Sequence, residues 1–175
     1  MPEGVEPGGS GTLHLAGALS VKSAHAERLV TACPAPWTYI ATAQAYDGEM
    51  RERIALHRSR RGEGWTTIDA PLDLVGAIET LPADRPVLID CLTLWLTNHM
   101  LAEDDVEAEC RGLVDLLSRP RGPWFVVSNE VGQGIVPDNA LARRFRDAAG
   151  RLNQQVAAVS DTVLLMVAGL PLKVK

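Results

Sequence analysis

The sequence contains few cysteines and no long apolar segment. Its three cysteines, Cys33, Cys91 and Cys110, are odd in number and lack the spacing of a metal site, which argues against a disulfide framework and favours a reducing compartment. No apolar run reaches the roughly 18 residues that a membrane-spanning helix needs, and the first residues show no charged-then-apolar signal pattern. We therefore expect a cytoplasmic protein without a membrane span.

An excess of basic residues is also absent. The chain carries 17 Lys and Arg against 22 Asp and Glu, a formal net charge of -5 at pH 7, so its overall charge gives no reason to expect a nucleic acid or an anionic membrane as partner. Arg143, Arg144 and Arg146 lack the interleaved aromatic residues of a nucleic-acid surface. We expect no nucleic-acid partner, and any anion must be bound by a local basic cluster.

The composition and the length are those of one globular domain. Apolar residues make up 46% and charged residues 22% of the 175 residues, which suffices to bury a core in a domain of ordinary size. Residues 1–11, MPEGVEPGGSG, are rich in glycine and predict a flexible leader. The sequence thus predicts a leader over residues 1–11 and a single domain over residues 12–175.

Short apolar runs alternate with amphipathic runs along this domain. The apolar runs predict strands at Thr12–Ala16, Trp37–Thr42, Pro86–Asp90, Trp124–Ser128 and Thr162–Val167. The amphipathic runs predict helices at Ser20–Ala32, Asp47–Arg61, Leu72–Leu81, Val106–Leu117 and Asp138–Ala158. This alternation predicts an α/β fold with a mostly parallel sheet flanked by helices. Ligands of such folds bind at the carboxyl ends of strands, so the residues that follow each strand are the candidates.

The first strand end carries A-G-A-L-S-V-K-S, from Ala16 to Ser23. A phosphate-binding loop reads G-x-x-x-x-G-K-[ST], and its backbone N–H groups, its lysine and a helix N-terminus converge on one anion. Lys22 and Ser23 are present, whereas Ala16 and Val21 stand where the pattern has glycine. By itself the stretch fits an ordinary helix start with Ser20 as N-cap better than it fits a nucleotide site.

An acidic residue ends the third predicted strand, in V-L-I-D-C-L-T-L-W. Asp90 follows apolar residues as the Mg²⁺-holding aspartate of a Walker B strand does, although a helix N-cap aspartate has the same pattern. The presence of Lys22 and Ser23 at another strand end strengthens the metal hypothesis. Cys91 has no evident partner base beside it, so we expect a buried thiol and not a nucleophile.

The fourth predicted strand runs into V-V-S-N-E-V-G-Q-G-I-V-P. Ser128, Asn129 and Glu130, followed by two glycines, fit a loop over a ligand. They fit equally well an ordinary turn, in which the glycines supply the backbone conformation that the turn needs. The residues alone leave both interpretations open.

The segment D-G-E-M-R-E-R-I-A-L-H-R-S-R-R gathers arginines in an otherwise acidic protein. Arg58, Arg60 and Arg61 follow directly on His57, and guanidinium groups chelate phosphate oxygens. A neutral imidazole beside them can attack an α-phosphate and hold a nucleotidyl group as a phosphoramidate. A histidine packed on a solvated basic helix explains the same residues, so both interpretations stand at this point.

In their order along the chain, these motifs resemble the bifunctional adenosylcobinamide kinase / adenosylcobinamide-phosphate guanylyltransferase family of cobalamin biosynthesis. The resemblance extends from about Leu13 to Lys175 and rests on YIATAQAYDGEMRERIALHRSRRGEGWTTID, VLIDCLTLWLTN, VVSNEVGQGIVP, ARRFRDAAGRLNQ and GLPLKVK. It implies a P-loop NTPase-like three-layer sandwich that assembles as a homo-oligomer, typically a trimer. It also implies two reactions. ATP or GTP phosphorylates adenosylcobinamide, and GTP then donates GMP through a guanylylated histidine to adenosylcobinamide phosphate, giving adenosylcobinamide-GDP.

The resemblance also implies where each part of this chemistry lies. His57 is the implied covalent acceptor of GMP, Lys22 is the implied catalytic lysine, and Ser23 with Asp90 would hold Mg²⁺. Asp69 ends the W-T-T-I-D piece, where the family usually has glutamate. The residues implied to bind the nucleotide are Ala16, Gly17, Ala18, Leu19, Ser20, Val21, Lys22, Ser23, Thr42, Ala43, Gln44, Arg58, Ser59, Arg60, Arg61, Asp69 and Asp90.

One departure from the family pattern falls in the phosphate loop, which the family writes G-G-A-R-S-G-K-S and this chain writes A-G-A-L-S-V-K-S. A β-branched residue such as Val21 tolerates the dihedral angles of such a loop poorly. The first hypothesis is therefore an active kinase and guanylyltransferase, and the second is a catalytically impaired or non-catalytic homologue that retains corrinoid or nucleotide binding. A different P-loop small-molecule kinase fits Lys22 and Asp90 but leaves His57 unexplained.

Overall fold

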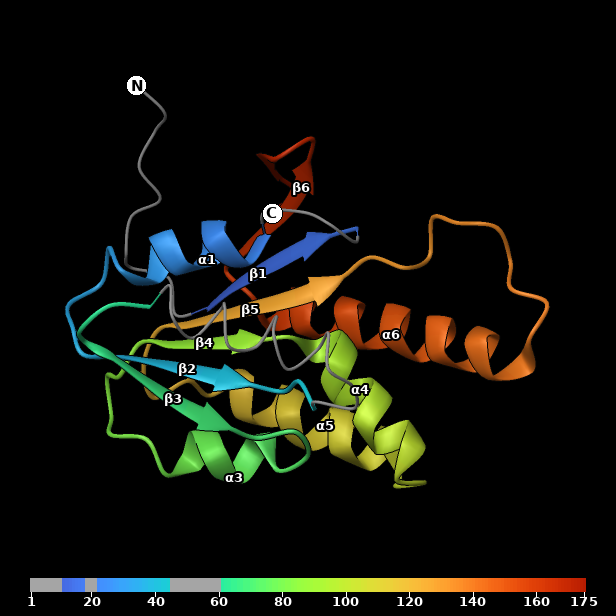
Figure 1. The fold of residues 1–175 in the computed structure, drawn as a ribbon, viewed down its shortest axis with the longest axis horizontal. Helices are drawn as coiled ribbons and strands as arrows, with labels where there is room; N and C mark the ends of the chain where they lie inside the picture. Colours follow the sequence, from blue (N-terminus) through green and yellow to red (C-terminus); the bar gives the residue numbers. More distant parts are fainter. Residues whose placement is uncertain (1–10, 18–21, 45–60) are drawn as a thin grey trace.

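A seven-stranded sheet forms the centre of the molecule (Figure 1). The computed structural model describes residues 11–17, 22–44 and 61–175. Its strands are β1 (Gly11–Ala16), β2 (Trp37–Ala41), β3 (Trp65–Asp69), β4 (Val87–Asp90), β5 (Trp124–Asn129), β6 (Thr162–Val167) and β7 (Leu170–Lys173). They lie in the order β3-β2-β4-β5-β1-β6-β7, and every neighbouring pair is parallel except β6 with β7. The prediction of a mostly parallel α/β sheet is confirmed.

Helices cover both faces of this sheet. The described helices are α1 (Lys22–Val30), α3 (Leu74–Glu79), α4 (Leu92–Leu101), α5 (Val106–Leu117) and α6 (Ala140–Val159). α1 packs on β1, β4 and β5 from one side, and the other four helices lie on the opposite side (Figure 1). None of the helices in the described ranges is both long enough and apolar enough to cross a bilayer.

The alternation of side chains along each strand divides the core between the two faces. In β4, Leu88 packs in the cluster under α1, whereas Val87 and Ile89 pack in the larger cluster under α3 to α6. Leu88 and Ile89 are both fully buried. Because central strands are covered on both faces, they read as continuous apolar runs, and this is the property that made them visible in the sequence.

The five predicted strands are all present, and none of their ends differs from the prediction by more than one residue. The sequence analysis did not identify β3, β7 or α4. β3 is an edge strand with exposed Thr66, Thr67 and Asp69, so it has no apolar run. β7, L-P-L-K, is only four residues long and contains a proline, which argues against a strand in the sequence. α4 begins at Leu92 and is buried on most sides, so it lacks an amphipathic pattern. The helix predicted at Asp47–Arg61 lies outside the described residues except for Arg61, which is not helical.

Candidate functional site

Two acidic residues lie at the same level on the strands that flank β2. Ala41 is paired with Asp69 of β3 on one side and with Asp90 of β4 on the other. Neighbouring strands are about 4.8 Å apart, so the two backbones stand roughly 10 Å apart at the carboxyl edge of the sheet. Asp69 is exposed and Asp90 is half-buried. The structure therefore brings these two predicted site residues to one edge.

Both carboxylates also project from the same face of the sheet. Side chains alternate along a strand, so Asp90 lies on the face of Leu88, and Asp69 lies on the face of Trp65. Leu88 and Trp65 pack in the cluster under α1. The candidate site thus lies at the carboxyl edge on the face that α1 covers.

The strand β1 and the helix α1 frame the phosphate-loop candidate. Ala16 is the last residue of β1, the exposed Gly17 follows it, and α1 begins at Lys22. Residues Ala18–Val21 lie outside the described part of the chain. β1 and β4 both run parallel to β5, so Ala16 and Asp90 end their strands at the same edge of the sheet. The helix α1, which begins with Lys22 and the half-buried Ser23, packs on β1, β4 and β5.

The thiol of Cys91 is buried beside Asp90. Its residue is 5% exposed, and burial, followed by the charge of Asp90, raises the pKa of Cys91 to about 11. The group is therefore a protonated thiol at neutral pH, which argues against a nucleophilic role because the thiolate is the reactive form. The expectation of a buried thiol is confirmed.

Thr42 joins the end of β2 to the turn after β4 by hydrogen bonds. Its hydroxyl donates to the carbonyl of Cys91 at 2.7 Å and accepts from the N–H of Cys91 at 2.8 Å. Its own N–H donates to the carbonyl of Asp90 at 3.1 Å, and its carbonyl accepts from Nδ2 of Asn98 at 2.8 Å. Thr42 is fully buried and acts as a positioning residue, while a contact with the nucleotide stays a prediction.

Tyr39 connects two of the predicted site residues. Its hydroxyl donates to Oδ2 of Asp90 at 2.8 Å, and Cζ of Arg61 lies 3.5 Å from the centre of its ring, a cation–π distance. The side chain of Arg61 is 5% exposed, and its Nη1 lies 4.0 Å from Oε1 of Glu27 in α1. Sequence reasoning did not identify Tyr39, because a tyrosine in an apolar strand reads as core.

The strand β5 lies between the strand of the phosphate-loop candidate and the strand of Asp90. The N–H of Asn129 donates to Oγ1 of Thr93 at 2.8 Å, and the N–H of Glu130 donates to the carbonyl of Ala16 at 2.9 Å. Asn129 and Glu130 are thereby held between the two candidate motifs, which favours the ligand-loop interpretation over a plain turn. Their only sequence signal is that polar residues directly follow a buried strand.

Eight predicted site residues cannot be compared with the structure. Like Ala18–Val21, the four residues His57, Arg58, Ser59 and Arg60 lie outside the described residues, so the roles of all eight stay predictions. Ala43 and Gln44 follow Thr42 at the end of β2, and both are half-buried. Of the arginines after His57, the structure thus places only Arg61, and it places it against Tyr39.

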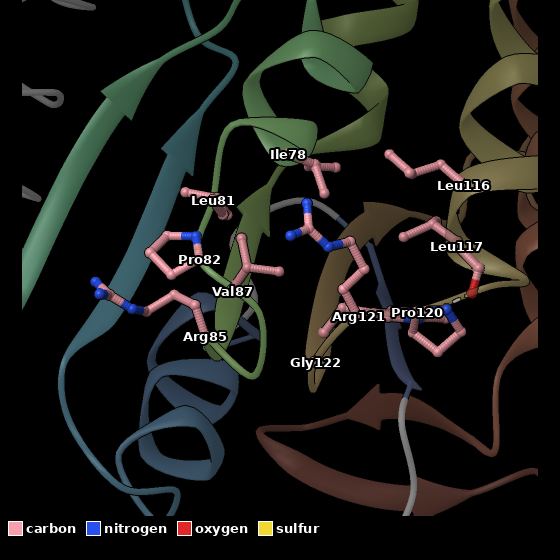
Figure 2. A pocket seen from close by; sticks show the side chains of 11 residues that line it. Ile78, Leu81, Pro82, Arg85, Val87, Leu116, Leu117, Pro120, Arg121 and Gly122 are labelled. Atoms are coloured by element: carbon pink, nitrogen blue, oxygen red, sulfur yellow. Dashed lines mark hydrogen bonds between the residues drawn. The ribbon is translucent and has the colours of Figure 1, made fainter.

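A small apolar pocket lies at the opposite end of the strands (Figure 2). Its volume is about 40 Å³, and Val87 and Trp124, the first residues of β4 and β5, form part of its wall. Figure 2 shows the side chain of Arg121 extending toward Ile78 across it, where Nη1 donates to the carbonyl of Glu79 at 3.0 Å. This pocket is separated from the candidate site by the length of the sheet.

Residues 12–174 match the family described as cobinamide kinase / cobinamide phosphate guanyltransferase. The chain belongs to this family. The bifunctional adenosylcobalamin biosynthesis protein CobP of Pseudomonas aeruginosa is 46% identical over 166 residues, which cover 93% of this chain and 96% of the relative. The bifunctional adenosylcobalamin biosynthesis protein CobU of Salmonella typhimurium is 39% identical over 176 residues, covering 91% and 96%, and that of Escherichia coli is 38% identical. The resemblance seen in the motifs is confirmed.

Solved structures share the architecture of this cobinamide kinase family member. A protein from Pyrococcus horikoshii OT3 superposes with a TM-score of 0.55 at 10% identity, covering 95% of this chain and 86% of its own. An ATPase from the type III secretion system of pathogenic bacteria superposes with a TM-score of 0.56 at 12% identity, covering 91% of this chain and 52% of its own. At such identities the likeness concerns the fold alone, and it confirms the P-loop NTPase-like sandwich.

Proposed function

We propose that this chain is a bifunctional adenosylcobinamide kinase and adenosylcobinamide-phosphate guanylyltransferase. The observation that carries the proposal is the carboxyl edge of the sheet, where β1 ends ahead of Lys22 and Ser23 and where Asp90 at the end of β4 is bonded to Tyr39, whose ring lies against Arg61. A helix N-terminus with a lysine suits phosphate oxygens, and a strand-end aspartate suits Mg²⁺. Membership of the family over residues 12–174 supports the choice of substrates.

In the kinase reaction the hydroxyl of adenosylcobinamide attacks the γ-phosphorus of ATP or GTP. The bond between this phosphorus and the β-phosphate oxygen breaks, the nucleoside diphosphate leaves, and the hydroxyl loses its proton. Catalysis of such a transfer consists mainly of positioning and of charge stabilisation. Lys22 and the N–H groups at the start of α1 supply the positive charge, and residues Ala16–Val21 would surround the phosphates.

Mg²⁺ fits this edge because it prefers oxygen ligands and usually takes one or two protein side chains together with substrate phosphates. Ser23 offers a hydroxyl, and Asp90 offers a carboxylate whose Oδ2 is already held by Tyr39. When bound there, Mg²⁺ would neutralise charge on the phosphates. The described ranges contain no group of three or more His, Cys, Asp or Glu that could hold a metal ion by itself.

In the guanylyl transfer the neutral imidazole of His57 attacks the α-phosphorus of GTP. A P–N bond forms, the bond to the β-phosphate oxygen breaks, and pyrophosphate leaves. A phosphate oxygen of adenosylcobinamide phosphate then attacks the same phosphorus, breaks the P–N bond and gives adenosylcobinamide-GDP. The residues that we propose to contact GTP, besides those of the phosphate loop, are Thr42, Ala43, Gln44, Arg58, Ser59, Arg60, Arg61, Asp69 and Asp90.

The family also leads us to propose a cytoplasmic homo-oligomer, typically a trimer. The three cysteines are free and buried, which is typical of proteins from reducing compartments. Size-exclusion chromatography with light scattering should give a mass of three copies of the 18.9 kDa chain. A monomeric mass at micromolar concentration would contradict the trimer, and it would leave the proposed reactions untested and unchanged.

Covalent labelling tests the proposed function. The protein is incubated with Mg²⁺ and GTP labelled at the α-phosphate, then denatured and washed. We expect a label that is lost in acid, as phosphoramidates are, and that is absent from His57→Ala. His99→Gln is the matched histidine control, because His99 is bonded to Asp104 at 2.7 Å and plays no part in the proposed chemistry.

The outcomes of this labelling separate the hypotheses. A label in the wild type and in His99→Gln, but not in His57→Ala, supports the guanylyltransferase. A label that survives in His57→Ala contradicts the assignment of the histidine. No label even at millimolar GTP contradicts the enzyme and favours a non-catalytic homologue.

A further inference from the structure

Tyr39 lies between the candidate acid Asp90 and the guanidinium of Arg61. Its hydroxyl donates to Oδ2 of Asp90 at 2.8 Å, and Cζ of Arg61 lies 3.5 Å from the centre of its ring. The ring of Trp65 meets it edge-on, with centroids 6.3 Å apart and an interplanar angle of 73°. Contacts on the face and on the edge hold the ring, and they leave its hydroxyl directed at the end of β4.

The hydroxyl of Tyr39 is a hydrogen donor toward Asp90. A phenol can donate only one hydrogen, and here it is donated to Oδ2 of Asp90 at 2.8 Å.

The guanidinium of Arg61 is buried, and the ring of Tyr39 compensates for part of its lost hydration. Its Nε and Nη1 are buried and have no hydrogen-bond partner within residues 11–17, 22–44 and 61–175. Its ion pair with Glu27 is long, at 4.0 Å, and a long ion pair compensates poorly for the desolvation of a guanidinium. The face of an aromatic ring attracts such a cation, so Arg61 and Tyr39 stabilise each other's position.

We propose that Tyr39 is a positioning residue that fixes the carboxylate of Asp90 for the Mg²⁺–nucleotide complex, with Arg61 holding the ring in place. The inference rests on the proposed function. The bond to Oδ2 fixes the orientation of the carboxylate of Asp90. A carboxylate that is already anchored loses less rotational freedom on binding, and binding is stronger for that reason.

The variant Tyr39→Phe keeps the ring and its contact with Arg61, and it removes only the hydroxyl. We expect the Mg²⁺ concentration for half-maximal guanylylation to rise about tenfold or more, as is typical when the partner of a metal ligand is lost. The matched control is Trp65→Phe, which alters the packing at the edge of the Tyr39 ring but leaves the bond to Asp90. Its Mg²⁺ requirement should stay near that of the wild type.

A double-mutant cycle shows whether Tyr39 acts through Asp90. If it does, adding Tyr39→Phe to Asp90→Asn should not raise the Mg²⁺ requirement further, because the shared interaction is already lost. A purely structural role of Tyr39 would instead lower the melting temperature of both backgrounds and leave the Mg²⁺ titration unchanged. Full additivity of the two substitutions on the Mg²⁺ requirement overturns the inference.

Failure of the inference and failure of the proposed function give different results. A wild type that takes the label, together with a Tyr39→Phe variant whose Mg²⁺ requirement lies within twofold of it, overturns the positioning role and leaves the function standing. A wild type that takes no label and shows no calorimetric binding of Mg²⁺–GTP overturns both. A large Mg²⁺ shift in Tyr39→Phe but not in Trp65→Phe supports the inference.

Discussion

The hydroxyl of Thr42 and the backbone of Cys91 exchange two hydrogen bonds, of 2.7 and 2.8 Å, across the ends of β2 and β4. One hydroxyl thus satisfies a buried donor and a buried acceptor in the turn that directly follows Asp90. The carbonyl of Cys91 also accepts from Trp95 at 3.2 Å, whereas its N–H has Thr42 as its partner. The position of Asp90 in the candidate site therefore depends on this threonine.

Replacement of Thr42 by valine should destabilise the protein by about 1–3 kcal/mol, because it leaves the buried N–H of Cys91 without an acceptor. Thr42→Ser keeps the hydroxyl and should lose less, since only a methyl group is removed. Urea unfolding monitored by tryptophan fluorescence measures both. A loss of stability in Thr42→Ser that exceeds the loss in Thr42→Val would show that packing of the methyl group, and not the hydrogen bonds, matters at this position.

A histidine pair between β1 and α1, with His14 fully buried and His25 half-buried, should make the protein sensitive to mild acid. The ring centroids of His14 and His25 are 5.4 Å apart, and His14 is fully buried. Burial, and secondly the charge of His25, lowers the pKa of His14 to about 3. Burial, and secondly the charge of Arg28, also lowers the pKa of His25. In the folded protein the His14 ring is therefore neutral well below its ordinary titration range, and the His25 ring loses its proton at a lower pH than a free histidine.

The sign of the effect follows from proton binding. Below pH 6.5 the unfolded chain binds protons at these histidines that the folded chain does not, so the free energy of unfolding falls as the pH falls, by about 1.4 kcal/mol per pH unit for one such group. We expect His14 alone to cost about 2 kcal/mol between pH 7 and pH 5. Urea unfolding at the two pH values should show this loss, and His14→Leu should reduce it. An unchanged pH dependence in His14→Leu would assign the loss to other groups.

Glycine at position 21 should strengthen nucleotide binding. Val21 stands where the family's phosphate loop has glycine, and the strain of holding a β-branched residue in dihedral angles suited to glycine is about 1–3 kcal/mol. Val21→Gly is therefore expected to lower the Kd for GTP by about 5- to 150-fold, which is that free energy expressed as a ratio. Isothermal titration calorimetry with Mg²⁺–GTP measures it. Unchanged or weaker binding would mean that the loop is adapted to valine.

The central strands and the family were predictable from the sequence for the same physical reason. Strands that are covered on both faces need apolar side chains at every position, so β4 and β5 stood out as runs such as V-L-I-D and W-F-V-V-S-N. The candidate phosphate-binding loop and the acidic residue at the end of a strand are short motifs, so they can be recognised in the sequence without knowledge of the fold. β3 was not predicted, because an edge strand with exposed Thr66 and Thr67 has no continuous apolar run.

The pairing of residues far apart in the chain was decided by the tertiary structure alone. Local reasoning identified Asp90 and Arg61 as separate candidates, and the tertiary structure placed both against Tyr39. Tyr39 precedes Asp90 by 51 positions, and only the parallel register of β2 with β4 sets its hydroxyl against that carboxylate. Register depends on packing across the whole sheet, which no short stretch of sequence encodes, and for that reason Tyr39 could be recognised only in the folded molecule.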